Sequence, residues 1–496
     1  MAVTIENAKQ TISQQAATIT ELREEVAWLK KQLFGRKAER LVDIAAEQPE
    51  LGLALAEEAD QAVTETTVAE HTRKDRKKPE RFQIPDDLPV EETVLDISEE
   101  DRVCLETGEP LVKLREEVSD KLAFRPGYFF IKRTIRPLYA SSADPSAGIL
   151  AAPLPPAPIA NCRADISLLK AMLIMKFVDH LPLYRIERIF KRDRIRIQRQ
   201  TLSSWVMQLG KLLLPLYHRM LHEVLAGDRL FTDSTSLRFI GRGPGCEKGV
   251  IWVYCGGPGG GKDPPYLIYD FSVDGSHKHT KRYLEKFSGL FHSDAHGAYE
   301  DTAGRDDIYW QPCLAHARRK FVELQSGDVA ARKQILESFG QLFLAEREVW
   351  KLTSAEARLA YRAAHCAAPT AKVFEVIEEQ LINGSSLPKS GFRKALLYLY
   401  RRKGHATTFL RDGNAVIENN LSERSIKPLV IGRKNWLFLG GKGAGEPTAA
   451  ILSIVQTCQH LGIDLNAYLE HALITLARGH ANIDELLPDR WQADNM

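Results

Sequence analysis

Residues 229–315 constrain the fold most, because they have the pattern of a sheet inside a chain whose other segments are mostly helical. This stretch contains five apolar runs rich in β-branched and aromatic residues: RLFTDSTSLRF, GVIWVYCGG, PYLIYDFSV, SGLFHSDAH and DIYWQPCL. Runs of this kind are typical of strands. Loops rich in Gly and Pro separate the first three runs, which predicts a meander of antiparallel hairpins.

Helical patterns alternate with the last two runs. Residues 280–287 predict a helix before the fourth run, and HGAYEDTAG predicts a helix or turn before the fifth. Three antiparallel strands followed by helix, strand, helix and strand is the order of a ribonuclease H-like core, so we expect an α/β fold. The first part of this core is assigned to residues 227–323.

The segments after the sheet are helical. Residues 316–400 are rich in Ala, Leu, Glu and Arg, and a helical pair at residues 446–478 is broken at Gly462. Three units are therefore expected after the sheet: a helical insertion over 324–400, a core segment over 401–445 that carries a third acid and a basic segment, and a C-terminal helical region over 446–496.

The N-terminal segment carries a seven-residue repeat. Apolar residues recur at one seam of this repeat: Ile5, Ile12, Ile19, Val26 and Leu33. β-branched residues in one seam and Leu in the other favour a parallel coiled coil over residues 1–40, and hence a homo-oligomer. A single amphipathic helix docked on its own chain is the alternative. Residues 41–92 are rich in Ala, Glu and Thr and nearly lack aromatic residues, which predicts a flexible linker.

Two further units precede the sheet. Residues 93–160 form a small strand-rich unit, in which residues 124–139 alternate as expected for a hairpin. Residues 161–226 are helical, with patterns at 165–178, 183–190 and 201–214. We expect Thr201 to cap the last of these helices. Two short helices with a basic connection resemble a DNA-binding helix-turn-helix; an ordinary three-helix bundle is the alternative.

Charge and cysteine content bound the partner and the compartment. The net charge of +2 conceals an acidic segment at residues 90–109 and basic segments at 183–199 and 424–442. Such segregation suggests a polyanionic partner, with a plain solvated surface as the alternative. The seven Cys residues are scattered and odd in number, which indicates a reducing compartment. The chain has no apolar signal core and no long apolar run, so we expect a cytoplasmic protein without membrane contact.

Three acids carry the candidate chemistry. Asp233 lies in the first predicted strand, Asp294 follows the fourth, and Glu423 lies on a later predicted helix. Both aspartates would project from one edge of a ribonuclease H-like sheet. Converging carboxylates repel one another, and a hard divalent cation relieves that repulsion; two Mg²⁺ ions about 4 Å apart suit phosphoryl transfer. Taken singly, each aspartate has a structural alternative: Asp233 as a turn former at the end of its strand, and Asp294 as a cap for a helix at Ala295.

The motif at residues 413–438 surrounds Glu423 with positive charge. Asn419 and Asn420 are favourable helix starters, because their side-chain oxygens can accept from first-turn amides. Asn420 and Glu423 also match a capping box, so a purely structural role for Glu423 stays open. We expect eight residues here and in the upstream CLAHARRK segment to contact DNA: His316, Arg318, Arg319, Arg424, Lys427, Arg433, Lys434 and Trp436. His316 is also a weak candidate for proton transfer.

The glycine-rich stretch at residues 256–263 is not a nucleotide site. GGPGGGKD nearly matches a phosphate-binding loop, but Asp263 follows Lys262 where Ser or Thr is needed. Pro264 and Pro265 prevent the helix that should come next. A hairpin loop is expected instead.

The sequence resembles transposases of the insertion-sequence-66 family over nearly its whole length. The carrying segments are LKKQLFGRKAERL, KFVDHLPLYRIERIF, FTDSTSL, LFHSDAHGAY, CLAHARRKF, IENNLSERSIKPLVIGRKNWLF and TCQHLGIDLNAYL. The resemblance implies a bacterial DDE transposase with Asp233, Asp294 and Glu423 as its triad. It also implies Mg²⁺ or Mn²⁺ as cofactor, double-stranded DNA with terminal inverted repeats as partner, and accessory proteins of the same element.

The chain departs from the family pattern at two places. The resemblance implies a zinc ribbon with paired Cys residues at the segment that matches residues 104–144. In this chain only one Cys remains among the matching positions: Cys104, Thr107, Ser141 and Asp144. One thiolate cannot hold a tetrahedral zinc, so this degenerate subdomain is expected to bind none. Glu418 stands where the family usually has Asp, and is the reserve candidate for the third ligand.

Two other functions compete with an active transposase. The lost Cys residues give weight to a non-catalytic DNA-binding regulator derived from a transposase, whereas the intact acids argue against it. A general nuclease or resolvase on the same fold is a weaker alternative.

Overall fold

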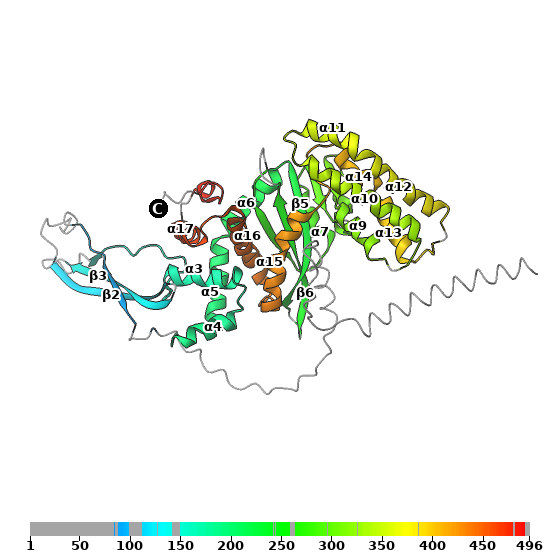
Figure 1. Ribbon diagram of the computed structural model, residues 1–496. Coiled ribbons are helices and arrows are strands. Elements are labelled where there is room, and N and C mark those ends of the chain that lie inside the picture. The colour runs from blue at the N-terminus through cyan, green and yellow to red at the C-terminus, as the bar shows by residue number, and fades with distance from the viewer. Residues whose placement is uncertain are drawn as a thin grey trace, which may run out of the picture.

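The computed structural model describes residues 84, 88–98, 112–125, 127–140, 149–241, 243, 245–257, 263–294, 296–324, 326–384, 386–479 and 482–491 (Figure 1). The predicted coiled coil over 1–40, most of the predicted linker over 41–92, and the four zinc-ribbon positions Cys104, Thr107, Ser141 and Asp144 lie outside these residues. Among the described residues, no helix combines the length and the apolar character that crossing a bilayer requires.

A five-stranded sheet forms the centre of the molecule. Its strands are β5 (Arg229–Ile240), β6 (Cys246–Gly256), β7 (Leu267–Ser272), β8 (Gly289–Ser293) and β9 (Ile308–Pro312), in the order β7-β6-β5-β8-β9. β5 pairs antiparallel with β6, and β6 with β7, whereas β5–β8 and β8–β9 are parallel. The predicted sequence of three antiparallel strands followed by two parallel ones is therefore confirmed.

The connections inside the sheet follow the prediction with shifted bounds. The helix before the fourth strand is α7 (His277–Leu284), which begins three residues earlier than predicted. The segment before the fifth strand forms a short 3₁₀ turn, η4 (Gly297–Tyr299), and α8 (Glu300–Ala303). Parallel strands need such crossover connections, because the chain leaves one strand at one end of the sheet and must return to the opposite end before the next strand begins.

Two later helices cover the sheet. α15 (Asn420–Trp436) lies against β5 and β6, and α16 (Gly445–Leu461) lies against β7 (Figure 1). β7 is an edge strand, and its outward amides would otherwise lack partners. The amide of Leu267 donates to Oγ1 of Thr457 at 3.0 Å, and the amide of Tyr269 donates to Oγ of Ser453 at 2.8 Å. α16 thus closes this edge with side-chain oxygens.

A helical insertion separates β9 from α15, as predicted. It comprises α9 (Leu314–Val322), α10 (Val329–Val349), α11 (Ala355–His365), α12 (Ala367–Ile382) and α13 (Gly391–Tyr400), followed by α14 (Lys403–Ala406) and the 3₁₀ turn η5 (Thr408–Leu410). These helices have a hydrophobic cluster of their own, centred on residues such as Phe339, Ile377 and Leu396. The insertion therefore has a second core beside that of the sheet.

A buried ion pair ties this insertion to the chain that leads into α15. Arg362 is fully buried and pairs with Glu346, with nitrogen–oxygen distances of 2.7 and 2.8 Å. The same guanidinium donates to the carbonyls of Phe409, Asp412 and Ala415 at 2.8–3.0 Å. Arg offers five donors in a fixed fork, so one side chain can satisfy all of these acceptors.

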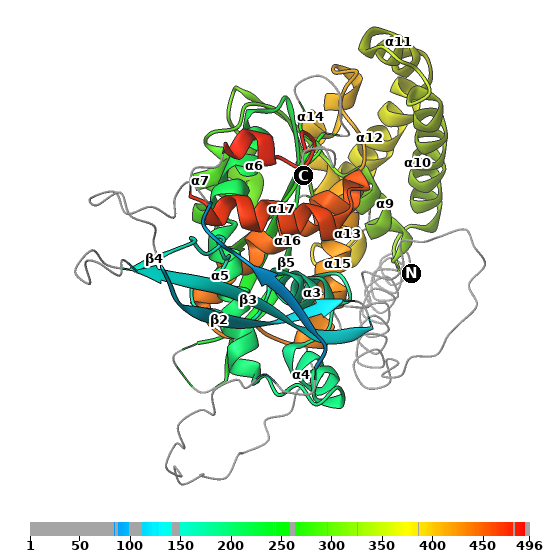
Figure 2. The same ribbon diagram turned by 90° about the vertical axis from the view of Figure 1, so that its left-hand side faces the viewer.

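The N-terminal unit is a sheet of four strands: β1 (Val90–Val94), β2 (Val112–Arg125), β3 (Tyr128–Ala140) and β4 (Ile149–Ala151). β2 and β3 form the predicted hairpin, although its turn lies at Gly127, near the start of the segment 124–139. β1 pairs with β3, so the linker predicted over 41–92 is wrong at its last three residues. This sheet lies at one end of the molecule and faces the viewer in Figure 2.

Four helices connect the two sheets: α3 (Ile166–Phe177), α4 (Leu183–Arg192), α5 (Arg199–Leu212) and α6 (Leu214–Ala226). The three predicted helices are confirmed. The Thr201 cap is wrong, because α5 begins two residues earlier with Gln198 at its N-cap. α6 was not predicted as a separate helix. The C-terminal pair, α16 and α17 (Leu465–Ala477), is broken at Gly462 as predicted, where φ is 69°.

Candidate active site

The two candidate aspartates lie on neighbouring parallel strands. Thr232 of β5 is in register with Ser293 of β8; Asp233 is the next residue of β5, and Asp294 directly follows the end of β8. Each is partly buried. Oδ1 of Asp233 accepts from the amide of Ser234 at 2.7 Å, and Oδ1 of Asp294 accepts from the amide of His296 at 3.2 Å.

The sheet register places Asp233 on the face that α15 covers. Asp233 pairs with Val253 of β6, and Val253 pairs with Tyr269 of β7. Side chains of paired residues project from the same face of a sheet. The hydroxyl of Tyr269 donates to the carbonyl of Ser425 on α15, so this is the α15 face.

The charges of both aspartates affect the pKa of one buried tyrosine. Tyr299 of η4 is fully buried, and its hydroxyl lies 3.3 Å from Oγ1 of Thr232. Burial raises its pKa well above the usual value, and the negative charges of Asp294 and Asp233 raise it further. The charges of both carboxylates therefore help to keep the phenol of Tyr299 protonated, at the point where the pairing of β5 with β8 ends.

The N-terminus of α15 is attached directly to β5 beside Asp233. Asn419 is the N-cap residue and fully buried, and its Nδ2 donates to the carbonyl of Thr232 at 2.8 Å. Its side-chain oxygen does not cap the helix, so the predicted role of this Asn as a side-chain cap is wrong. Oδ1 of Asn419 is a buried oxygen without a hydrogen-bond partner. Such an atom is costly unless something else binds it.

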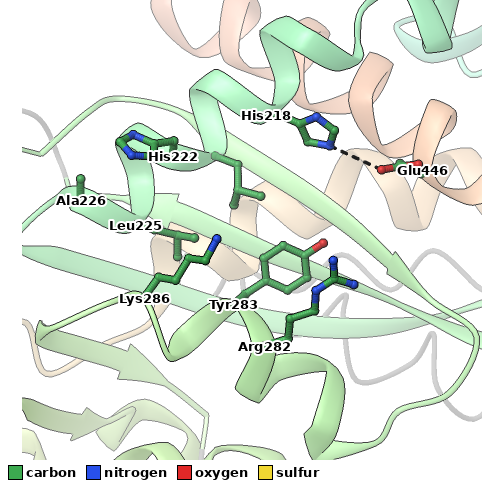
Figure 3. Close-up of a pocket in the computed structure, with 9 residues that line it drawn as sticks. His218, His222, Leu225, Ala226, Arg282, Tyr283, Lys286 and Glu446 are labelled. Atoms are coloured by element: carbon green, nitrogen blue, oxygen red, sulfur yellow. Dashed lines mark ion pairs between the residues drawn. The ribbon is translucent and has the colours of Figure 1, made fainter.

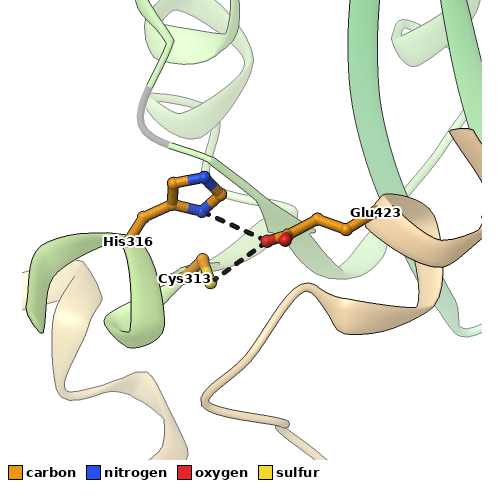
Figure 4. A group of neighbouring side chains, drawn as sticks. All are labelled: Cys313, His316 and Glu423. Atoms are coloured by element: carbon orange, nitrogen blue, oxygen red, sulfur yellow. Dashed lines mark hydrogen bonds and ion pairs between the residues drawn. The ribbon is translucent and has the colours of Figure 1, made fainter. Parts of the chain in front are cut away.

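Glu423 approaches two residues of the CLAHARRK segment. Its Oε1 lies 3.3 Å from Nδ1 of His316, and the thiol of Cys313 points at the same oxygen from 4.0 Å (Figure 4). The side chain therefore turns away from its own helix terminus, and the capping-box alternative for Glu423 is not adopted. Burial raises the pKa of the Cys313 thiol to about 12, and the nearby Glu423 charge adds to this shift.

The three predicted acids do not gather into one tight cluster. Within the described part of the chain, one group of three potential ligand atoms lies within 4.8 Å of one another, and it consists of Cys313, His316 and Glu423. The pattern C-x-x-H in CLAHARRK was the available signal for this group. Cys313 carries no charge, so it does not stand out as a DNA contact or as a ligand for a hard cation.

The reserve candidate Glu418 lies in the loop before α15. It is partly buried, and its Oε2 accepts from Nδ2 of Asn420. The loop itself is anchored to the sheet, because the amide of Val416 donates to Nε2 of His292 at 2.9 Å. Burial lowers the pKa of His292 to about 3, so this imidazole stays neutral and remains an acceptor.

The predicted DNA contacts divide into exposed and buried residues. Arg424, Lys427 and Lys434 are exposed on α15, at spacings that place them along one side of the helix. Arg433 is partly buried, and its guanidinium donates to Oγ1 of Thr235 on β5 at 2.8 Å. The first three residues form an outward-facing row of positive charge, which we call the α15 basic row.

Trp436 lies in the core and is only 8% exposed. Its ring meets Phe177 of α3 edge-on, with 5.9 Å between centroids, and Nζ of Lys176 lies 4.6 Å from its centroid. The structure therefore assigns Trp436 to packing between α15 and α3 rather than to an accessible surface. His316, Arg318 and Arg319 are partly exposed on α9.

A second basic surface lies on α4 and the turn into α5. Seven positively charged residues are exposed there: Arg185, Arg188, Lys191, Arg192, Arg194, Arg196 and Arg199. The apolar side chains of the same segment, including Ile186 and Phe190, are buried. This separation is what an interface for a polyanion requires.

A cavity of ≈ 470 Å³ lies between α6, α7 and the start of α16 (Figure 3). His218 and His222 line one side of it, and Arg282 and Lys286 line the other. Nε2 of His218 pairs with Glu446 at 3.4 Å. The predicted acids are not among the lining residues, so this cavity is separate from the candidate active site.

Comparison with known proteins gives the class. A family model described as "Transposase IS66 family" matches residues 161–447, and one described as "Transposase C of IS166 homeodomain" matches residues 21–93. Two similar curated proteins come from Sinorhizobium fredii and are called uncharacterized protein y4jD and uncharacterized protein y4hP. The first is 30% identical over 514 residues, covering 100% of this chain and 99% of its own length. The second is 30% identical over 507 residues, covering 96% and 89%.

The first match spans the central sheet, the insertion and α15, which are the elements that hold the candidate acids. These elements form a mixed α/β core with exposed basic surfaces. The chain belongs to the IS66 family of transposases.

Proposed function

We propose that the chain is a DDE transposase that cleaves and joins DNA strands at the ends of an insertion sequence. The central sheet would be a ribonuclease H-like core, with Asp233, Asp294 and Glu423 as its acids. The observation that supports this proposal most is the register Thr232–Ser293, because Asp233 and Asp294 follow these two residues and the N-cap residue of α15 donates to the carbonyl of Thr232. Family membership supports the same reaction.

The available donors suit Mg²⁺ or Mn²⁺. Asp233 and Asp294 offer carboxylate oxygens, and Oδ1 of Asn419 is a buried oxygen without a partner next to β5. Hard cations prefer oxygen ligands of this kind. When bound, two such ions activate an attacking oxygen and stabilise a leaving one.

The rest of the site would hold and orient DNA. The α15 basic row lies on the exposed side of the helix whose first turn carries Glu423, so a bound phosphate backbone would run along that helix. The basic surface of α4 and α5 offers a second contact of the kind expected for terminal inverted repeats. Phosphate contacts fix register and orientation without reading sequence. Self-association and accessory proteins of the same element are further expectations of this function.

The test is cleavage of a labelled duplex that carries an element end, with Mg²⁺, Mn²⁺ or chelator. The proposal expects metal-dependent nicking at the end sequence, and no nicking of a duplex with a scrambled end. Glu470 of α17 pairs with Lys170 away from the site, so Glu470→Gln is a matched control for Asp233→Asn. Specific binding without cleavage under any metal would overturn the proposal.

A non-catalytic DNA-binding regulator is the second candidate. The observation that favours it is the exposed basic surface of α4 and α5, which needs none of the acids to bind DNA. Binding of element ends that is indifferent to Asp233→Asn, together with absent nicking, would support this function. Nicking that is equal on element ends and scrambled duplexes would instead indicate a general nuclease or resolvase.

A further inference from the structure

We propose that Cys313, His316 and Glu423 form a binding site for a thiophilic divalent cation, with Zn²⁺ as the natural occupant. One ligand atom from each residue, namely Sγ, a ring nitrogen and a carboxylate oxygen, lies within 4.8 Å of the other two. The residues come from the end of β9, from α9 and from α15, so the fold itself brings them together (Figure 4).

The separations fit a tetrahedral ion. Zinc bonds of about 2.0 Å to nitrogen and oxygen and about 2.3 Å to sulfur place tetrahedral ligands about 3.3–3.6 Å apart. The observed separations from Oε1 of Glu423 are 3.3 Å to His316 and 4.0 Å to Cys313. The first separation already fits, the second exceeds the tetrahedral value by a few tenths of an ångström, and all three ligand atoms lie within 4.8 Å of one another.

The surroundings also suit a bound thiolate. The amide of Asn419 donates to Sγ of Cys313 at 3.3 Å, which would stabilise negative charge on the sulfur. Nδ1 of His316 is buried and makes no hydrogen bond, so its lone pair is available to an ion once the proton sits on the other ring nitrogen. His316 is 28% exposed, which leaves a route for the ion and for a water as fourth ligand.

The donor set discriminates between metals. Mg²⁺ demands oxygen ligands, whereas sulfur, nitrogen and oxygen together suit Zn²⁺ or Co²⁺. On binding, the Cys313 thiol releases its proton to solvent and a sulfur–metal bond forms. Glu423 cannot serve this ion and a Mg²⁺ pair together, so Zn²⁺ would compete for the third acid. This competition rests on the proposed function; the binding itself does not.

The experiment is a Co²⁺ titration of the full-length chain, stripped of metal and kept reduced. We expect one equivalent to give a thiolate charge-transfer band in the near ultraviolet and strong visible bands of four-coordinate Co²⁺, both bleached by Zn²⁺. Cys313→Ser should lose the charge-transfer band. Cys246→Ser is the matched control, because Cys246 is an exposed thiol on β6, and it should keep the band. A band that persists in Cys313→Ser, or is lost in Cys246→Ser, overturns the proposal.

Two further variants cover the case in which Cys313→Ser does not fold. His316→Gln and Glu423→Gln each remove one ligand, and each should weaken Co²⁺ binding at least tenfold. Unchanged affinity in both contradicts the site. This outcome is separable from the proposed function. The expected Co²⁺ spectra without Mg²⁺-dependent nicking would support the zinc site and contradict the transposase activity. Nicking without a thiolate band would support the transposase activity and contradict the zinc site.

Discussion

The strand-borne and helix-borne acids of this site are positioned in different ways. Asp233 and Asp294 owe their proximity to the pairing of Thr232 with Ser293, a local property of two adjacent strands. Glu423 is held by contacts across more than a hundred residues, to His316 and Cys313. The comparison teaches that pairing within the sheet is enough to position the two aspartates, whereas the position of Glu423 depends on the folding of α9 and α15.

Removing a strand acid should have the largest effect. A metal ligand of this kind contributes several kcal/mol to the stabilisation of the transition state, and each 1.36 kcal/mol is tenfold in rate. Asp233→Asn and Asp294→Asn should each reduce nicking by about a thousandfold or more, as measured by single-turnover cleavage. Their unfolding midpoints in urea should stay close to that of the unaltered chain. Nicking within tenfold of that chain would contradict the assignment.

Removing the buried ion pair of the insertion should destabilise the fold, and with it the position of Glu423. Arg362→Met leaves Glu346 buried without its partner, which costs about 3–5 kcal/mol. We expect this loss in the free energy of unfolding measured by urea, together with loss of nicking. Arg347→Met, at an exposed position on the same helix as Glu346, is the matched control and should change the free energy of unfolding little. Equal stability of the two variants would show that the ion pair does not hold the insertion in place.

Acid should weaken the anchor of the loop before α15. The folded pKa of His292, about 3, lies below its ordinary value of 6.5, so the unfolded state binds the proton first. Stability from this group is fully present above pH 6.5, and is lost by about 1.4 kcal/mol per unit as pH falls from 6.5 towards 3. The free energy of unfolding should fall more steeply between pH 6 and pH 4 than in His292→Leu. Parallel slopes would contradict this role.

Changes in the α15 basic row should have the smallest effect. Lys427→Gln removes one exposed charge, so the slope of log binding constant against log salt should fall by about 0.9 for duplex DNA. Affinity should weaken equally for element ends and scrambled duplexes, because phosphate contacts carry no sequence information. Lys333→Gln, an exposed charge on α10, is the control. An unchanged salt slope in Lys427→Gln would place DNA elsewhere.

Sequence alone predicted the parts that depend on local pattern. The strand order, the helical insertion and the break at Gly462 follow from periodicity and from glycine in a left-handed turn, where φ is positive. The position of Asp233 in β5 and of Asp294 directly after β8 followed from that strand order. The exact start of α5 did not, because the helix begins at Arg199 with Gln198 as its N-cap, although Thr201 is the better intrinsic cap.

The parts that depend on tertiary contact were harder to predict. Trp436 follows two basic residues in the chain, but α3 supplies Phe177 and Lys176 to bury it. Asn419 gives its amide group to β5 instead of capping its helix. In the sequence Cys313 stands far from Glu423, and only the fold shows that the two side chains are neighbours. In each case the partner lies far away in sequence.

The substitution Glu423→Gln tests the central claim most directly. Gln preserves the size of the side chain beside His316, but it removes the charge that a metal ligand needs. With an unchanged unfolding midpoint, we expect Mg²⁺-dependent strand transfer to be lost in Glu423→Gln and retained in Glu418→Gln. Strand transfer that survives Glu423→Gln would show that this carboxylate is not the third ligand, and loss confined to Glu418→Gln would assign that place to its neighbour.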